Sequence, residues 1–75
     1  MRAYVLIHAQ AGEATVLARE IKRAPGVVRA DYVFGSFDVI AEVEANDLAS
    51  LGRLVFEGIR VQPGVIDTQT CLAVE

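Results

Sequence analysis

The sequence predicts an α+β fold of the ferredoxin-like type, in which two helices cover one face of a four-stranded antiparallel sheet. Two observations lead to this prediction. Four β-rich stretches alternate with two apolar stretches of helical period, in the order β-α-β-β-α-β. Residues 21–27 also align with residues 59–65, so the chain repeats itself at an offset of 38 positions. Two β-α-β units with right-handed crossovers interleave into a sheet of this kind.

The first half of the chain predicts a strand over residues 3–9 and a helix over about residues 13–24. The strand is rich in the β-branched and aromatic side chains that sheets favour. Apolar side chains recur along one face of the helix at Ala14, Leu17, Ala18 and Ile21. The Pro25 and Gly26 pair that follows ends the helix.

The two middle strands, residues 27–34 and 37–44, are expected to form a tight hairpin. Only Gly35 and Ser36 separate them. A two-residue link that starts with glycine is typical of a type II′ turn, because the first central position needs a positive φ. We therefore expect these strands to be antiparallel neighbours.

The second helix is predicted to begin near Asn46 or Asp47, since either side chain can cap it. Its apolar stripe comprises Leu48, Leu51, Gly52, Val55, Phe56 and Ile59. A second Pro-Gly pair at positions 63–64 ends this helix, and the last strand covers about residues 65–74.

The 75 residues fit one domain, residues 1–75, but 53% of them are apolar and the mean hydropathy is +0.39. The core of a domain this small cannot bury all of these apolar side chains. Bulky groups occupy both faces of the first strand, Val5 and Ile7 on one and Tyr4, Leu6 and His8 on the other. We expect a second copy to cover the open sheet face at a spacing of about 10 Å, giving a homodimer of the dimeric α+β-barrel type.

Charge and composition exclude several classes of function. A net charge of −3 and a pI near 5.0 disfavour direct binding to nucleic acid. The longest apolar run, residues 3–7, is too short to cross a membrane, and no signal peptide is evident. Phosphate-binding glycine loops are absent, and the single cysteine forms no internal disulfide or metal cluster. We expect a cytoplasmic protein without cofactor or metal.

Two residues carry reactive side chains. His8 is the only histidine, and the usual pKa of an imidazole would suit a general base, but a histidine at a subunit contact is the favoured interpretation. Cys71 is interpreted as a small buried hydrophobic residue, because the sequence places no cation or helix N-terminus beside it.

Three polar residues are candidates for ligand binding. Asp38 follows the predicted turn, where its carboxylate can reach a docked group or bond local backbone N–H groups, and spacing alone favours neither. Thr68 and Thr70 share one side of the last strand. Their hydroxyls can bind a small polar ligand, although β-propensity alone explains either threonine.

Five segments together resemble the effector-binding (RAM) domain of the Lrp/AsnC family of transcriptional regulators, over essentially the whole chain. They are Tyr4-Val5-Leu6-Ile7, Pro25-Gly26-Val27, the stretch Val33-Phe34-Gly35-Ser36-Phe37-Asp38-Val39-Ile40, Pro63-Gly64-Val65 and Thr68-Gln69-Thr70. The Gly-x-aromatic-Asp pattern of the third segment is the most specific of the five.

The resemblance implies dimers that pair through their sheets, rings of dimers, and a free amino acid bound where dimers meet. It places the ligand site around the middle hairpin, with Gly35, Ser36, Phe37, Asp38, Thr68 and Thr70 as the expected binding residues. The expected ligand is a small neutral amino acid, with Val33 and Ile40 favouring a branched chain.

Regulators of this family carry an N-terminal helix-turn-helix, whereas the first strand here starts at residue 3. The sequence is therefore similar to the stand-alone versions of the domain. Two roles follow: an amino-acid sensor that assembles with full-length relatives, or a small-molecule-binding protein of unknown output. The alternatives are a cofactor-independent monooxygenase or isomerase that uses His8, and a regulatory domain of the ACT type.

Overall fold

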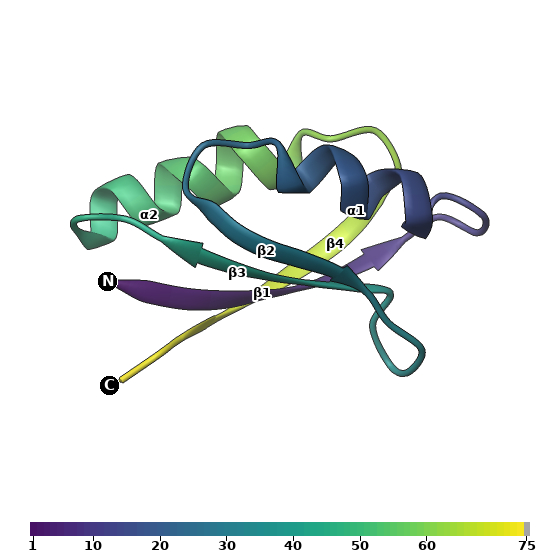
Figure 1. Ribbon diagram of the computed structural model, residues 1–75, viewed down its shortest axis with the longest axis horizontal. Coiled ribbons are helices and arrows are strands. Elements are labelled where there is room, and N and C mark those ends of the chain that lie inside the picture. The colour runs from purple at the N-terminus through teal and green to yellow at the C-terminus, as the bar shows by residue number, and fades with distance from the viewer. Residues whose placement is uncertain (75) are drawn as a thin grey trace.

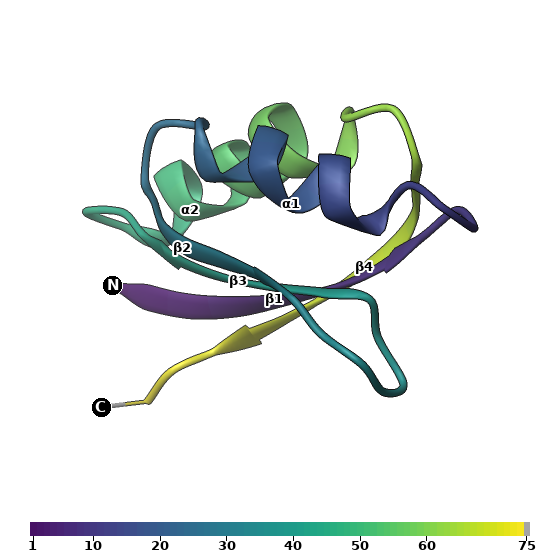
Figure 2. The same ribbon diagram turned by 45° about the vertical axis from the view of Figure 1, so that its right-hand side comes forward.

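The computed structural model, which describes residues 1–74, has the predicted ferredoxin-like architecture. Its elements are β1 (Arg2–Ala9), α1 (Ala14–Lys22), β2 (Val27–Tyr32), β3 (Val39–Glu44), α2 (Leu48–Leu54), η1 (Val55–Arg60) and β4 (Val65–Leu72). The strands form one antiparallel sheet in the order β2-β3-β1-β4, and the helices lie together on one side of it (Figures 1 and 2). No helix within residues 1–74 has the length and apolar character needed to span a bilayer.

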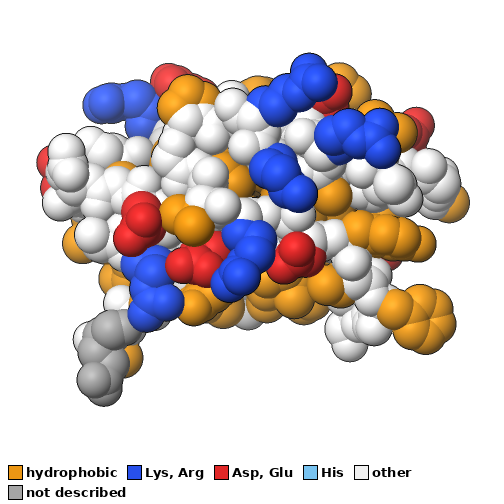
Figure 3. All heavy atoms as spheres, viewed as in Figure 1, with side chains coloured by type: hydrophobic (Ala, Val, Ile, Leu, Met, Phe, Trp, Pro, Cys, Tyr) orange, Lys and Arg blue, Asp and Glu red, His pale blue; other side chains and the backbone are white. Residues whose placement is uncertain are grey.

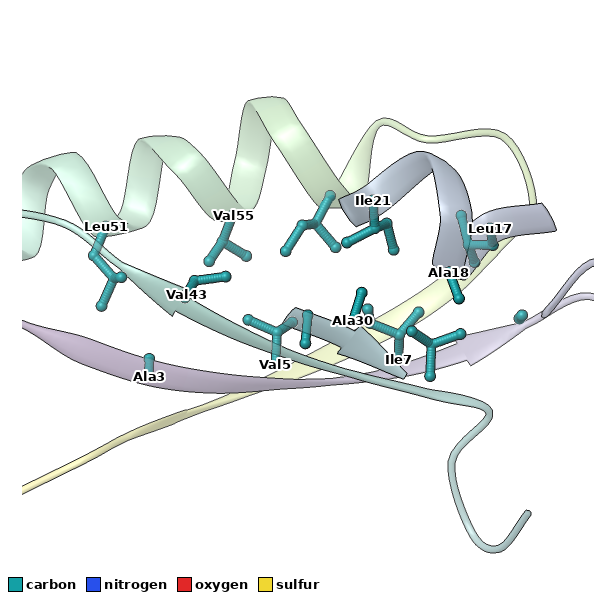
Figure 4. Packing of buried hydrophobic residues seen from close by; sticks show 14 residues of the cluster. Ala3, Val5, Ile7, Leu17, Ala18, Ile21, Ala30, Val43, Leu51 and Val55 are labelled. Carbon is teal, nitrogen blue, oxygen red and sulfur yellow. The ribbon is translucent and has the colours of Figure 1, made fainter. Parts of the chain in front are cut away.

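The core lies between the sheet and the helices (Figure 4). It consists of Ala3, Val5, Ile7, Ala9, Leu17, Ala18, Ile21, Ala30, Val39, Ala41, Val43, Leu51, Val55 and Ile59. Every second residue of β1 belongs to it, because successive side chains of a strand point to opposite faces. The remaining residues of β1, including His8, therefore lie on the face that the helices leave open.

The internal repeat is visible in the backbone. Gly26 and Gly64 both have positive φ, at 89° and 97°, which glycine adopts without steric cost. Equivalent hydrogen bonds precede them: Ala24 N–H donates to the Ile21 carbonyl at 3.0 Å, and Gln62 N–H donates to the Ile59 carbonyl at 3.1 Å. The repeated Pro-Gly pair thus ends each helix in the same way.

The second helix starts as predicted and continues as a π-helical segment. Asp47 caps α2, since its carboxylate accepts a 2.8 Å hydrogen bond from Ser50 N–H. The predicted apolar stripe is only half covered. Leu48 and Phe56 are exposed and border a hollow of about 190 Å³ that Thr70 of the edge strand β4 also lines.

The predicted two-residue turn at Gly35 and Ser36 is wrong. β2 ends at Tyr32 and β3 begins at Val39, so residues 33–38 form a six-residue loop. Within residues 1–74, positive φ occurs at three other glycines and not at Gly35. Beyond the one backbone hydrogen bond that closes its base, the loop makes its hydrogen bonds with Ile7, His8 and Ala9 of β1.

The two ends of the described chain lie side by side at one end of the sheet (Figure 1). Ala73 N–H donates to the Arg2 carbonyl at 2.9 Å, and Ala3 faces Leu72 in the pairing of β1 with β4. β1 and β4 therefore join the beginning of the first repeat to the end of the second.

Candidate functional site

The loop of residues 33–38 extends from the sheet on the side away from the helices (Figures 1 and 2). Two backbone hydrogen bonds of 2.9 Å close its base: Val33 N–H donates to the Asp38 carbonyl, and Asp38 N–H donates to the Ile7 carbonyl. Phe34 near the tip is fully exposed, and space is open around Gly35. The loop is thus anchored at its base and projects beyond the sheet.

His8 connects this loop to two strands. It lies opposite Asp67 in the pairing of β1 with β4, and its Nδ1 is 2.6 Å from Asp67 Oδ1. Its Nε2 is 2.8 Å from the Ser36 carbonyl oxygen. The ring stacks on Phe37 with centroids 4.3 Å apart and planes at 15°. We call His8, Asp67, Ser36 and Phe37 the His8 cluster.

The chemistry of the His8 cluster favours a charged imidazole. A carboxylate and a carbonyl are both acceptors, so both ring nitrogens of His8 must donate, which only the imidazolium does. The hydrogen bonds to Asp67 and to the Ser36 carbonyl raise the pKa of His8 above its ordinary value, partly opposed by desolvation. In this protonated form His8 presents no lone pair to a substrate, so the imidazolium itself is not a general base.

The Asp38 carboxylate accepts a hydrogen bond from the backbone. Its Oδ2 accepts a 2.8 Å hydrogen bond from Ala9 N–H, at the point where the pairing of β1 with β4 shifts register. The acceptor role predicted for Asp38 therefore involves a neighbouring strand rather than its own turn. A carboxylate has about four acceptor positions, so Asp38 keeps capacity for a ligand ammonium.

The structure does not bring the six predicted site residues together within one copy. Ser36, Phe37 and Asp38 lie close to His8, and Gly35 is next to them in the loop. Thr68 and Thr70 pair with the buried Ile7 and Val5, so they lie on the helix side of the sheet. The strand period of two indicates this, because it places Asp67 and Thr68 on opposite faces.

A second polar cluster lies farther along the open face and was not predicted. Arg29 Nη2 is 3.1 Å from Glu42 Oε1, and Arg2 Nη1 is 3.9 Å from Glu42 Oε2. Arg2 Nη1 also donates to the Tyr4 hydroxyl at 2.8 Å. Figure 3 shows acidic and basic side chains alternating along the sheet, with hydrophobic side chains below them. Sequence reasoning missed these pairs because they join residues on three strands.

Cys71 is exposed in the chain, so the prediction of a buried residue is wrong. It faces Tyr4 in the pairing of β1 with β4 and therefore lies on the open side of the sheet. The prediction failed because the position of Cys71 in the alternation along β4, and not its hydropathy, determines which face of the sheet its side chain lies on.

Four surface hollows lie away from the loop. The largest, about 530 Å³, lies between the Pro25-Gly26 turn and α2, and Arg53 and Glu57 contribute to its lining. Thr70 is the one predicted site residue that lines any of the four. Among residues 1–74, no group of three His, Cys, Asp or Glu side chains is arranged to hold a metal ion. The loop of one copy thus lies outside all four hollows.

Comparison with known protein families identifies one that covers almost the whole chain. The Lrp/AsnC ligand binding domain matches residues 2–75. An uncharacterised HTH-type transcriptional regulator of Pyrococcus horikoshii, PH1916, is 33% identical over 57 residues. That match covers 76% of this chain and 38% of the regulator, so the chain corresponds to a minor part of this longer relative.

Two solved structures illustrate the structural likeness. The crystal structure of TTHA0845 from Thermus thermophilus is 32% identical, with a TM-score of 0.91, and the match covers 99% of this chain and 92% of that one. A transcriptional regulator from Neisseria meningitidis, NMB0573, solved in complex with L-Met, is 18% identical with a TM-score of 0.84. Its match covers 99% of this chain and 49% of that one, and at this identity it shows the shared fold alone.

Proposed function

Because the chain belongs to the Lrp/AsnC ligand-binding domain family, we propose that it binds a free amino acid and couples this binding to association between copies of itself. The ligand is a small neutral amino acid, with branched side chains favoured. The output is regulatory rather than enzymatic, through mixed assembly with longer regulators of the family. The amino acid seen with the distant Neisseria relative supports this class of ligand.

The observation that carries the proposal is the anchored loop at the margin of the sheet face that both helices leave open. A zwitterion presents an ammonium and a carboxylate, which pair with a carboxylate and with N–H groups. In the proposed site, Asp38 receives the ammonium and backbone N–H groups from Gly35 to Phe37 receive the carboxylate. The hydroxyls of Thr68 and Thr70 reach the ligand from a neighbouring copy.

The open face supports the proposed association. Tyr4, Leu6 and Ile40 are only partly covered there, and the helices contribute nothing to that side. A second sheet stacked on this face would remove these groups from water, at about 25 cal/mol for each Å² of apolar surface. We propose a homodimer through this face, with further assembly into rings of dimers that complete the ligand site.

A thermal-shift screen of the twenty amino acids, read together with the mass from light scattering, tests the proposal. A ligand at a hundred times its Kd adds about 2.7 kcal/mol to the free energy of unfolding, which a domain this small shows as a clear rise in Tm. We expect a rise for one or a few neutral amino acids and a mass of at least a dimer. No rise with any of the twenty, or a monomer at micromolar concentration, would contradict the proposal.

Asp38→Asn sharpens the test, because the amide oxygen can still accept from Ala9 N–H while the charge is lost. We expect a Kd about 10- to 100-fold weaker, the range of a charge-assisted hydrogen bond. Glu20→Gln on α1 is the matched control, since it removes the same charge on the helix side of the sheet, opposite to the loop. Equal affinity in both variants would remove Asp38 from the site.

A further inference from the structure

His8 is the side chain through which the projecting part of the loop is tied to the sheet. Its Nε2 meets the Ser36 carbonyl at 2.8 Å and its ring covers Phe37. The base of the loop is held separately, by the backbone and carboxylate hydrogen bonds of Asp38. The base therefore does not depend on the charge of His8, whereas the contacts of Ser36 and Phe37 do.

Loss of one proton from His8 breaks a particular contact. A neutral imidazole has one N–H donor, and two acceptors face its two nitrogens. The hydrogen bond to the charged Asp67 carboxylate is the stronger of the two, so the remaining proton stays on Nδ1. The lone pair of Nε2 then faces the Ser36 carbonyl oxygen, and these two electron-rich atoms repel each other.

We propose that His8 is a pH-sensitive latch, which holds Ser36 and Phe37 against the sheet when protonated and releases them when neutral. A charged ring also attracts the face of Phe37, and this attraction is lost with the proton. The latch itself needs no ligand. Its consequence for amino-acid binding rests on the proposed function, because Ser36 and Phe37 belong to the proposed site.

The groups that face His8 determine the direction of the pH dependence. Asp67 of β4 and Asp38, the last residue of the loop before β3, carry negative charge near the ring and raise the pKa of His8 above 6.5. The next residues along the open face, Leu6, Ile40 and Gln69, are uncharged. A group with a raised pKa contributes fully at pH values below its ordinary pKa. The latch is therefore closed below pH 6.5 and opens as the pH rises through the raised pKa.

Proton NMR against pH tests the latch, since His8 is the single histidine and its ring signals are unambiguous. The ring protons of Phe37 do not exchange with water and report the stacking directly. We expect the Phe37 signals to move with the same midpoint as His8, at a pH above 6.5. Phe37 signals that stay constant while His8 titrates would overturn the proposal.

Two variants and one control separate the latch from general effects of pH. Asp67→Asn removes the charge but keeps an oxygen for Nδ1–H, so both midpoints should fall together towards 6.5. His8→Gln should abolish the pH dependence of the Phe37 signals. Asp31→Asn is the control, because its carboxylate lies 3.8 Å from Arg29 Nε and is not among the groups that act on His8. A Phe37 midpoint that fails to follow His8 in Asp67→Asn would contradict the latch.

Titration of ligand binding distinguishes the latch from the proposed function. For any amino acid that binds, we expect the Kd to weaken about two- to tenfold between pH 6 and pH 8, the range of one hydrogen bond. His8→Gln should bind with no such dependence. A normal NMR titration with no binding of any amino acid would uphold the latch and reject the proposed ligand. Binding that is independent of pH beside a normal NMR titration would reject only the coupling between the two.

Discussion

The two β-α-β halves of the molecule have the same order of elements but different neighbouring residues. β1, α1 and β2 repeat as β3, α2 with η1, and β4, and the helix of each half ends in a Pro-Gly turn with positive φ at the glycine. Ile21 and Ile59 occupy the same place in the repeat, and both are fully buried. The halves differ in how the helix begins and in what packs against the turn.

The difference shows which parts of a repeat are fixed by backbone geometry and which by neighbours. Any chain that leaves a helix through this turn needs a residue tolerant of positive φ, so both glycines are required. The surroundings are not repeated: Leu54 and the Glu44 carbonyl lie against Gly26, whereas the Glu13 side chain lies against Gly64. Substitutions at equivalent positions should therefore lower the stability of the fold by different amounts where the neighbouring side chains differ. They should lower it by the same amount where the backbone conformation or the core packing is the same.

The largest inequality is expected at the two turn glycines. A Cβ on Gly26 would lie 2.2 Å from Leu54 Cδ1 and 3.0 Å from the Glu44 carbonyl oxygen, whereas at Gly64 the nearest atom is Glu13 Cβ at 3.3 Å. Positive φ costs alanine about 1–2 kcal/mol at either site, and the clash at Gly26 adds about 1–2 more. We expect Gly26→Ala to lose about 2–4 kcal/mol and Gly64→Ala about 1–2 kcal/mol.

Urea denaturation followed by circular dichroism measures both losses. The slope of each transition should be unchanged, since neither variant alters the area exposed on unfolding. Equal losses would show that Leu54 moves aside without cost, and the difference between the turns would then have no energetic meaning.

An equal loss is expected from the paired core isoleucines. Ile21→Val and Ile59→Val each remove one methylene from a fully buried side chain, which costs about 0.5–1.5 kcal/mol. The two values should agree closely, because each side chain packs between its own helix and the shared sheet. The same urea experiment decides, and a large difference would mean that one helix packs more loosely than the other.

An effect on one side of the repeat only is expected at the helix starts. Asp47 caps α2 through Ser50 N–H, whereas Glu13 makes no side-chain cap to α1. Asp47→Ala should lower the urea midpoint, and Glu13→Ala should leave it almost unchanged.

The contribution of the Asp47 cap to stability should depend on pH in the acid range. The hydrogen bonds with Ser50 hold the pKa of Asp47 below its ordinary value of 3.8. A lowered pKa contributes stability above pH 3.8 that disappears as the pH falls through the folded value. The difference between wild type and Asp47→Ala should thus be constant above pH 4 and vanish in stronger acid. A difference that persists there would show that the cap does not depend on the charge.

The fold was predictable because its signals are local. The helical period located Leu17, Ala18 and Ile21, the capping pattern narrowed the helix start to Asn46 or Asp47, and the Pro-Gly pairs located both helix ends. Each of these features depends on residues within one turn or one helix. The repeat then supplied the topology, since two similar β-α-β units leave few arrangements for the sheet.

The site was harder to predict because its contacts are distant in sequence. His8 and Asp67 are 59 positions apart, and His8 and Ser36 are 28 positions apart. The glycine at position 35 matched a local turn rule, but the loop takes its shape from the sheet beneath it. The alternation of side chains along β4 could have placed Thr68 and Asp67 on opposite faces of the sheet. The pairing of His8 with Asp67, in contrast, could be found only from the register between β1 and β4.

The adjacency of the two chain ends has a consequence for the order of the repeats. The Ala73 N–H to Arg2 carbonyl hydrogen bond places the ends beside each other, and the connection between the halves is the exposed loop of residues 33–38. A circular permutation that bridges the ends and opens the chain at Gly35 would exchange first repeat for second while keeping every strand partner. Such a permutation would change the connectivity of the chain and leave the packing of the sheet as it is.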